Sequence, residues 1–280
     1  MTSEKATRIA FQGELGAYSH EAALNARPDA TPVPCATFDD AFKAMHEGRA
    51  DLAMLPVENT TYGRVADIHR LLPKSGLHII DEGFVRVRIN LMAPKGVTLD
   101  QIKHVRAHLV LLPQARNFLD QHGITVEAAA DSAGAAADLA RHPEPGVGAL
   151  ASAVAAEIHG LDVLARDIED EHNNTTRFLL MSHAIDTTRR SAHMITTFVF
   201  EVRNIPAALY KAMGGFATNG VNMTKLESYM VGGSFTATQF YADIEGHPDD
   251  PAVRRALEEL DYFTNMIEIL GVYPAHPDRN

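Results

Sequence analysis

The stretch HNNTTRFLLMSH, residues 172–183, sets two amides, two hydroxyls and one guanidinium directly before an apolar run. The run RFLLM predicts a buried strand, and Asn and Thr before a strand are typical of a loop that bonds its own backbone. The same groups could also bind a small polar molecule at the start of the strand. Taken alone, the stretch favours a loop followed by a strand.

Outward from this stretch, short apolar runs alternate with helical patterns through the first two thirds of the chain. RIAFQG (8–13), ADLAMLPVEN (50–59) and the alternating FVRVRINLMA (84–93) predict strands. FDDAFKAMHEG (38–48) predicts an amphipathic helix with its large apolar residues on one face. This alternation predicts an α/β region with mostly parallel sheets, whose ligands bind at the carboxyl ends of strands.

The composition restricts the classes of protein. A length of 280 residues suggests about two domains, and a net charge of −11 disfavours nucleic acid as a partner. Cys35 is the only cysteine, so an intrachain disulfide and a cysteine-pair metal site are excluded. The first residues lack the apolar segment of a secretory signal, and no apolar stretch is long enough for a membrane span. We therefore expect a cytoplasmic protein with no membrane partner.

The pattern changes after the polar segment AIDTTRRSAH (184–193), which predicts a linker. Beyond it follow a strand, a helix, two strands around Gly232-Gly233, a second helix and a last strand. This βαββαβ order predicts an α+β domain with the ferredoxin-like arrangement.

Two polar segments could form a binding site in the α/β region. In GELGAYSHEAA (13–23), Ser19 is expected to cap a helix whose free N–H groups suit a carboxylate-sized anion. Glu58, Asn59 and Thr60 follow an apolar strand, where they line a cleft or form a turn. The NNTT segment precedes its strand, so it must reach such a site from the opposite direction.

A metal site is a weaker interpretation of the acidic segment RDIEDEHNN (166–174). It gathers Glu169, Asp170, Glu171 and His172, but a solvated acidic loop explains this composition better. The chain has no HExxH or other metal-ligand spacing.

Taken together, three motifs resemble those of the prephenate dehydratase family. GELGAYS resembles the family's N-terminal motif, and PVENT (56–60) resembles Pro-Ile/Val-Glu-Asn-Ser with Thr60 in place of Ser. Asn174, Thr176, Arg177 and Phe178 match the signature Asn-x-Thr-Arg-Phe. The last 90 or so residues resemble the ACT domain that follows in this family and binds phenylalanine.

Three segments depart from the family pattern. AHLVLLPQ (107–114) replaces a Ser-His-Pro-Gln-Ala-Leu segment, although His108 and Leu112 are kept. In the second part of the chain, ESYM (227–230) replaces Glu-Ser-Arg-Pro, and PAAL (206–209) replaces Pro-Gly-Ala-Leu. The last two departures bear on how tightly an effector binds.

The resemblance implies a fold and its boundaries. Residues 1–185 are expected to form a two-lobed, periplasmic-binding-protein-like catalytic region. One lobe holds residues 8–80 with 168–183, and the other holds 84–165. Residues 192–280 are expected to form the ACT regulatory domain, with no chorismate mutase domain before them.

The resemblance also implies a reaction, the decarboxylative dehydration of prephenate to phenylpyruvate in phenylalanine biosynthesis, without cofactor or metal. Thr176 is the expected donor to the leaving hydroxyl, and Glu58 is expected to relay a proton or orient Thr176. Arg177 is expected to clamp a carboxylate in the same cleft. The expected substrate-binding residues are Ser19, Asn59, Thr60, Asn174, Thr175, Arg177 and Phe178.

Phenylalanine is the expected effector, bound between subunits of a homodimer or homotetramer. A helix opening at Pro206 is expected to hold its carboxylate. The expected effector-binding residues are Pro206, Ala207, Ala208, Leu209, Asn222, Met223, Glu227 and Ser228.

Two other functions remain open. Arogenate differs from prephenate only in an amino group in place of a keto group, so an arogenate dehydratase would use the same site. A two-lobed α/β region with an ACT domain also suits a sensor that binds an aromatic amino acid without turnover.

Overall fold

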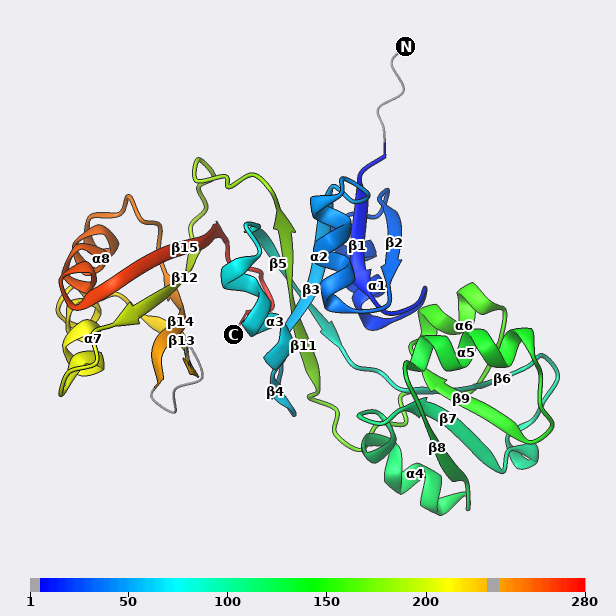
Figure 1. The fold of residues 1–280 in the computed structure, drawn as a ribbon. Helices are drawn as coiled ribbons and strands as arrows, with labels where there is room; N and C mark the ends of the chain where they lie inside the picture. The colour runs from blue at the N-terminus through cyan, green and yellow to red at the C-terminus, as the bar shows by residue number, and fades with distance from the viewer. Residues whose placement is uncertain (1–5, 231–236, 280) are drawn as a thin grey trace, which may run out of the picture. The chain divides into compact units, whose positions relative to one another are not determined.

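The computed structural model describes residues 6–230 and 237–279, and the chain divides into two compact units (Figure 1). The first unit comprises Met1–Ile68 and Gly83–Phe178, and the second comprises His69–Glu82 and Leu179–Asn280. The first five residues and the predicted Gly232-Gly233 turn lie outside the described residues.

A mostly parallel sheet forms one lobe of the first unit. Thr37 caps its second helix by accepting from the Asp40 N–H at 3.1 Å, and the predicted apolar face is buried at Phe42 and Met45. The strands β2, β1 and β3 are parallel neighbours in that order, and β4 is antiparallel to β3. The elements are β1 (Arg8–Gln12), α1 (Tyr18–Ala26), β2 (Thr31–Cys35), α2 (Phe38–His46), β3 (Leu52–Asn59), β4 (Gly63–Arg64) and α3 (Ala66–Leu71).

A mixed five-stranded sheet, in the order β10-β6-β9-β7-β8, forms the other lobe. β7 is parallel to both β8 and β9, so the carboxyl ends of these three strands meet at one edge, where α5 and α6 begin. The elements are β6 (Asn90–Ala93), β7 (His104–His108), α4 (Arg116–Gln121), β8 (Thr125–Ala129), α5 (Ser132–Arg141), β9 (Val147–Ala151), α6 (Ala153–His159) and β10 (Asp162–Ala165).

The alternating segment 84–93 is not one strand, and that prediction was wrong. β5 (His78–Arg86) ends before the lobe crossing, and β6 begins in the other sheet. The returning chain runs beside this crossing, because the Val87 N–H bonds the Asn174 carbonyl at 2.8 Å and the Ile168 N–H bonds the Ile89 carbonyl at 2.9 Å. Alternation persists across the break because Val87 and Ile89 are both buried. It reported burial rather than strand continuity.

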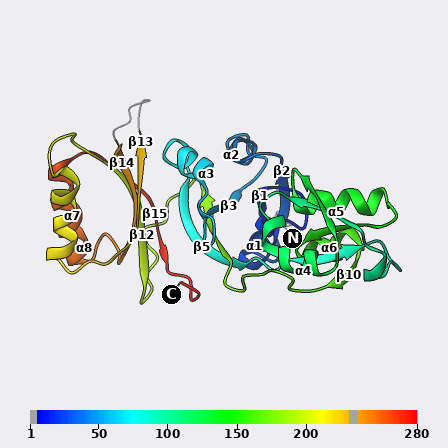
Figure 2. The same ribbon diagram turned by 90° about the horizontal axis from the view of Figure 1, so that it is seen from below.

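The second unit has the ferredoxin-like arrangement that the sequence predicts. Its antiparallel strands follow the order β13-β14-β12-β15, and α7 and α8 lie on one face of them (Figure 2). Phenylalanines from both layers, among them Phe198, Phe200 and Phe216, form its core. The elements are β12 (Met194–Val202), α7 (Ala208–Thr218), β13 (Met223–Met230), β14 (Ala237–Glu245), α8 (Pro251–Phe263) and β15 (Thr264–Pro274).

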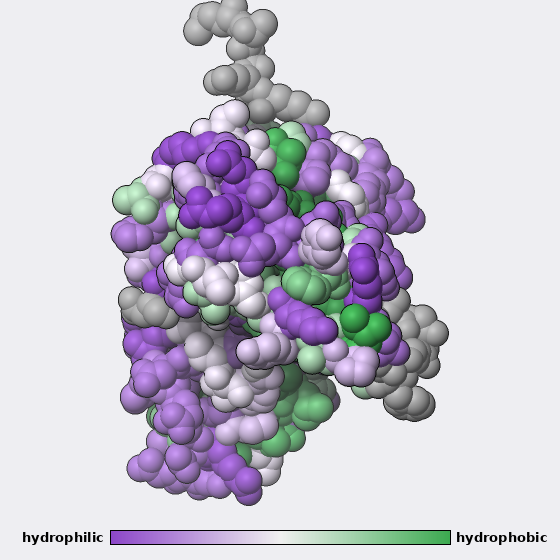
Figure 3. Space-filling model, turned by 90° about the vertical axis from the view of Figure 1, so that its left-hand side faces the viewer, coloured by the Kyte–Doolittle hydropathy of each residue, from purple (hydrophilic) through white to green (hydrophobic). Residues whose placement is uncertain are grey.

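The surface in Figure 3 is mainly hydrophilic, with hydrophobic side chains scattered among polar ones. Scattered apolar residues of this kind are normal for a protein surface in water. No helix among residues 6–230 and 237–279 has the length and apolar composition needed to cross a membrane.

Residues 69–82 belong to the second compact unit, whereas we expected the first lobe to extend to residue 80. Ile79 of β5 pairs with Gly271 of β15, where a Cβ would lie 2.3 Å from the Ile79 carbonyl oxygen. Arg189 donates to the Ile80 carbonyl at 2.6 Å, and the His69 ring bonds the Tyr229 hydroxyl. These contacts come from residues more than 100 positions away, so no local pattern reveals them.

Candidate functional site

A cavity of about 160 Å³ lies in the first unit at the edge where three strands end and helices begin. α1, α5 and α6 all start at its wall. The lining residues are mostly small or polar, and they comprise Gln12, Gly16, Ala17, Tyr18, Ser19, His108, Leu111, Ala130, Asp131, Ser132, Ala133, Ala151 and Ser152. The wall therefore offers hydroxyl and backbone N–H groups to a ligand.

The wall joins the two lobes of the first unit through Gly16 and Ser152. The Ser152 hydroxyl donates to the Gly16 carbonyl at 2.6 Å and accepts from the Ala155 N–H at 3.1 Å, which caps α6. Gly16 has φ +95°, and a Cβ there would lie 2.5 Å from the Cα of Ala155. Glycine is required here because any side chain would push the lobes apart.

Ser19 does not cap α1, and that prediction was wrong. The helix begins at Tyr18 with Ala17 as its N-cap, because the turn at Gly16 leads the chain into the helix two residues early. Ser19 is nevertheless 7% exposed and lines the cavity, so it stays a binding candidate.

A network of neutral side chains holds Thr176. The Asn59 amide nitrogen donates to the Thr176 hydroxyl oxygen at 3.0 Å and to the Asn174 side-chain oxygen at 2.6 Å. The amide oxygen of Asn59 accepts from the Thr61 and Tyr62 N–H groups, each at 2.9 Å, which fixes the direction of the amide. Since Thr176 accepts from Asn59, its own proton remains available to a ligand.

The network continues to the loop that walls the cavity. The Asn174 amide bonds the Gln114 side-chain oxygen, and Gln114 donates to the Val110 carbonyl at 2.7 Å. His108 and Leu111 of the same loop line the cavity. The loop thus connects the Thr176 network to the cavity wall.

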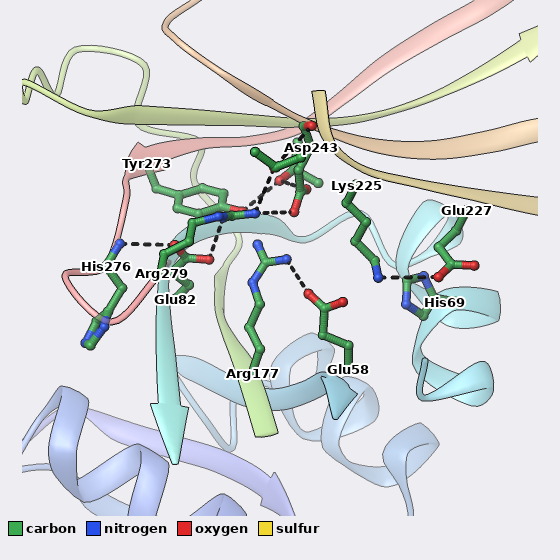
Figure 4. A network of polar contacts seen from close by, with 12 residues as sticks. Glu58, His69, Glu82, Arg177, Lys225, Glu227, Asp243, Tyr273, His276 and Arg279 are labelled. Atoms are coloured by element: carbon green, nitrogen blue, oxygen red, sulfur yellow. Dashed lines mark hydrogen bonds and ion pairs between the residues drawn. The ribbon is translucent and has the colours of Figure 1, made fainter. Parts of the chain in front are cut away.

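The structure separates Thr176 from Arg177, which we had placed in one cleft, and this is a correction. Side chains alternate along a strand, so consecutive residues of β11 (Thr175–Ser182) point to opposite faces, as do Glu58 and Asn59 of β3. Asn59 contacts Thr176, whereas Glu58 pairs with the buried Arg177 at 2.8 Å (Figure 4). Glu58 therefore lies on the wrong face to relay a proton to Thr176.

The remaining predicted residues hold the strands together. The Thr60 N–H bonds the Thr175 carbonyl at 3.0 Å, and the Thr60 hydroxyl donates to the Asn173 carbonyl at 3.0 Å. The end of β3 thus meets the start of β11. The NNTT segment therefore reaches the residues after β3 from the opposite strand direction, as the sequence predicts. Phe178 is 1% exposed and belongs to the core.

Sequence reasoning missed most of the cavity. Asp131, Ser132 and Ser152 directly follow the strands of ITVEAAAD and GVGALAS, and the rule that ligands bind at strand carboxyl ends would have selected them. His108 lines the cavity and is a kept position of the altered AHLVLLPQ segment, whereas no local pattern marks Gln114, which belongs to the Thr176 network.

Two ionisable groups beside the cavity, Tyr18 and His20, favour their neutral forms. Burial raises the pKa of Tyr18, whose hydroxyl donates to the Arg88 carbonyl at 2.8 Å. Burial lowers the pKa of His20, which accepts from the Gly16 N–H at 3.0 Å and stacks on Phe11. Neither group is suited to carry charge at neutral pH.

The acidic segment is exposed at Glu171 and His172, as expected of a solvated loop, but that interpretation was wrong for Glu169. Glu169 is 3% exposed and accepts from the Ile89 N–H at 2.9 Å, which secures the lobe crossing. Among the described residues, no group of three or more His, Cys, Asp or Glu side chains could hold a metal ion.

The predicted effector residues lie in the second unit. α7 begins at Ala208 rather than at Pro206, with Ala207 as N-cap at φ +61°. Asn222 and Met223 follow the other end of α7, about 16 Å away for eleven residues at 1.5 Å each. Glu227 pairs with Lys225 at 3.4 Å, and Ser228 is exposed. Within one chain, Ala207 and Asn222 therefore lie near opposite ends of α7.

Known proteins share both the sequence and the fold. The family model described as prephenate dehydratase matches residues 9–186. A Komagataeibacter europaeus protein named bifunctional N-acyl-homoserine lactone acylase/prephenate dehydratase is 49% identical over 278 residues, covering 97% of each chain. The Arabidopsis thaliana arogenate dehydratase/prephenate dehydratase 2 is 36% identical, covering 95% of this chain and 72% of that protein. The crystal structure of prephenate dehydratase from Arthrobacter aurescens in complex with L-Phe superposes with a TM-score of 0.88 at 31% identity, covering 98% of this chain and 91% of that one.

Proposed function

The chain belongs to the prephenate dehydratase family, and on this premise we propose that it converts prephenate to phenylpyruvate. The observation that supports this most is the Thr176 hydroxyl, which accepts from Asn59 and keeps its own proton for a ligand. A fixed hydroxyl donor is what departure of a ring hydroxyl requires.

In the proposed reaction, the bond between the ring and its carboxylate carbon breaks, and CO2 leaves. The electron pair of that bond enters the ring as the opposite C–O bond breaks, and the departing oxygen takes a proton from water. Thr176 donates a hydrogen bond to this oxygen as its negative charge develops, without giving up the proton. Aromatisation drives the reaction, so we propose neither a cofactor nor a metal.

Neutral groups suit this role. Asn59, Asn174 and Gln114 orient Thr176 without placing a charge beside it. A preorganised donor stabilises developing charge without reorganising during the reaction. We propose that Glu58 acts on Arg177 instead, by holding its guanidinium in place.

A two-substrate assay tests the proposal. Purified protein is mixed with prephenate or with arogenate, and phenylpyruvate or phenylalanine is measured. We expect phenylpyruvate from prephenate; turnover of arogenate alone would identify an arogenate dehydratase. Binding of both compounds with neither product would identify a sensor and refute the enzyme.

A second activity is favoured by one relative. The Komagataeibacter europaeus protein is named an N-acyl-homoserine lactone acylase as well as a prephenate dehydratase, and it matches this chain along nearly its whole length. We propose that this chain also hydrolyses the amide bond of N-acyl-homoserine lactones. We expect release of free homoserine lactone, which mass spectrometry detects. No release at high enzyme concentration would exclude this activity.

We further propose that phenylalanine regulates the enzyme between two copies of the chain. The support is the L-Phe complex of the Arthrobacter aurescens relative, together with the separation of Ala207 from Asn222 by the length of α7. Calorimetry with the full chain, inhibition assays and sedimentation at matched concentrations test this. No binding and no inhibition at millimolar phenylalanine would leave the second unit a structural role alone.

A further inference from the structure

A substrate with two carboxylates needs two anion sites, and the cavity wall has no Lys or Arg among its described lining residues. Arg177 is not among these lining residues, and it pairs with Glu58 on the face of β11 opposite Thr176. The donors that the lining offers to an anion are therefore backbone N–H groups, hydroxyls and the side chains of Gln12 and His108.

We infer that the start of α5, with the Ser132 hydroxyl, binds one carboxylate of the substrate, opposite a second carboxylate at Ser19. This inference rests on the proposed function. It adds an anion site to the cavity and assigns Ser132 to one of the two carboxylates that prephenate and arogenate share.

The first turn of α5 leaves donors for a ligand. The Asp131 carboxylate takes the Gly134 N–H at 2.8 Å, and the Ala135 N–H bonds the Asp131 carbonyl at 3.0 Å. The N–H groups of Ser132 and Ala133 have no acceptor in the described part of the chain, as expected for the start of a helix. Both residues line the cavity, where the helix dipole favours an anion.

Two buried hydroxyls support the site independently of the helix. Ser19 is 7% exposed and lines the cavity, and its hydroxyl has no hydrogen-bond partner among the described residues. Ser132 is also 7% exposed, and its oxygen accepts from the His108 N–H at 3.0 Å. That bond orients the Ser132 hydroxyl and leaves its proton to donate. Buried hydroxyls facing a cavity with unused protons are suited to an anionic ligand.

The negative charge of Asp131 opposes anion binding in the cavity, so a substitution that removes this charge provides a second test. Its carboxylate lines the same cavity, although the Gly134 N–H and the Glu14 N–H, at 2.8 and 3.3 Å, draw its charge toward the helix start. Asn caps a helix about as well as Asp, so Asp131→Asn removes the charge and keeps the cap. The substitution should therefore tighten binding of an anion at Ser132.

The test compares Ser132→Ala, Ser132→Thr and Asp131→Asn with the control Ser182→Ala, a half-buried serine at the end of β11. Ser132→Ala should raise KM for prephenate about tenfold, the effect of one charged hydrogen bond, with a smaller change in kcat. Ser132→Thr should keep KM close to the wild-type value, because threonine retains the hydroxyl. Asp131→Asn should lower KM, and the control should match the wild type.

Calorimetry of prephenate binding in the Thr176→Ala background gives the same comparison without turnover. Affinity that is unchanged by Ser132→Ala and by Asp131→Asn in a folded protein would overturn the inference while leaving the dehydratase intact. A wild-type protein that binds prephenate but forms no product would refute the proposed function instead, and the calorimetric comparison would still decide the role of Ser132.

Discussion

The two units each contain a polar cluster, but the clusters are of opposite kinds. The first unit joins Asn59, Asn174, Gln114 and Thr176 through neutral groups. The second buries an ionic cluster, in which Arg279 contacts Glu82 and Asp243 at 2.8 Å each (Figure 4). Neutral amides orient a hydroxyl and leave its proton available to a ligand, whereas buried charges must be matched and therefore hold the structure in place.

The ionic cluster fastens residues 69–82 to the sheet of the second unit. The side chains of Glu82 and Asp243 are fully buried, and each has further donors. The Thr197 hydroxyl donates to Asp243 at 2.6 Å, and the His276 N–H donates to Glu82 at 3.0 Å. Arg279 thus links β14 to β5, which explains why this part of β5 belongs to the second unit.

Removing Arg279 should have the largest effect on stability. Arg279→Ala leaves two carboxylates buried without their guanidinium, which should lower the free energy of unfolding by about 3–5 kcal/mol. Urea unfolding measures this, with Arg116→Ala as the control. Arg116 pairs with Asp120 on the exposed surface of α4, so its loss should change little. Equal losses of unfolding free energy in the two variants would show that the buried ionic cluster does not hold the second unit together.

The neutral network should be sensitive to a single charge. Asn59→Asp keeps the size of the side chain but replaces the amide donor with an acceptor, so the Thr176 proton turns toward it and away from the substrate. We expect kcat to fall about a hundredfold, the usual effect of losing one transition-state donor. Steady-state kinetics at saturating prephenate measure it. An Asn59→Asp enzyme with normal kcat would show that the direction of this hydrogen bond is irrelevant.

The buried His20 beside the cavity predicts a pH dependence of stability. Burial places the pKa of His20 below its unfolded value, so its contribution to stability is complete above the unfolded pKa of about 6.5. That contribution is lost as the pH falls from there through the folded pKa. Thermal unfolding between pH 7 and 4.5 should show a shallower acid loss in His20→Gln than in the wild type. Parallel curves would mean that His20 does not resist protonation.

The smallest effect is expected at the start of α7. Ala207 has φ +61°, a conformation that suits glycine, and the related motif has glycine there. Ala207→Gly should stabilise the protein by about 0.5–1 kcal/mol, whereas Ala217→Gly, within the exposed face of the same helix, should destabilise it by about 1 kcal/mol. Chemical unfolding of both variants checks the opposite signs.

The sequence predicted both sheets because apolar periodicity reports burial directly. The same alternation also predicts that Thr176 and Arg177 point to opposite faces, because they are adjacent residues of one strand. The family motif lists Thr176 and Arg177 side by side and does not indicate which face of the strand each occupies. The sequence also places Ser132 and Ser152 just after predicted strands, but it does not show that they line the same cavity.

Other features could not be predicted from local patterns. The direction of the Asn59 amide depends on the Thr61 and Tyr62 N–H groups, which the turn after β3 brings together. The transfer of residues 69–82 to the second unit depends on Arg279, almost 200 positions away from Glu82. Such long-range pairings need the folded chain.

The most direct measurement of the central claim compares Thr176→Val with Thr176→Ser. Valine matches threonine in shape but lacks the hydroxyl, and serine keeps the hydroxyl without the methyl group. Single-turnover formation of phenylpyruvate from saturating prephenate should fall by about a hundredfold or more in Thr176→Val and by far less in Thr176→Ser. Near wild-type rates in a folded Thr176→Val protein would show that the hydroxyl does not assist departure of the ring oxygen.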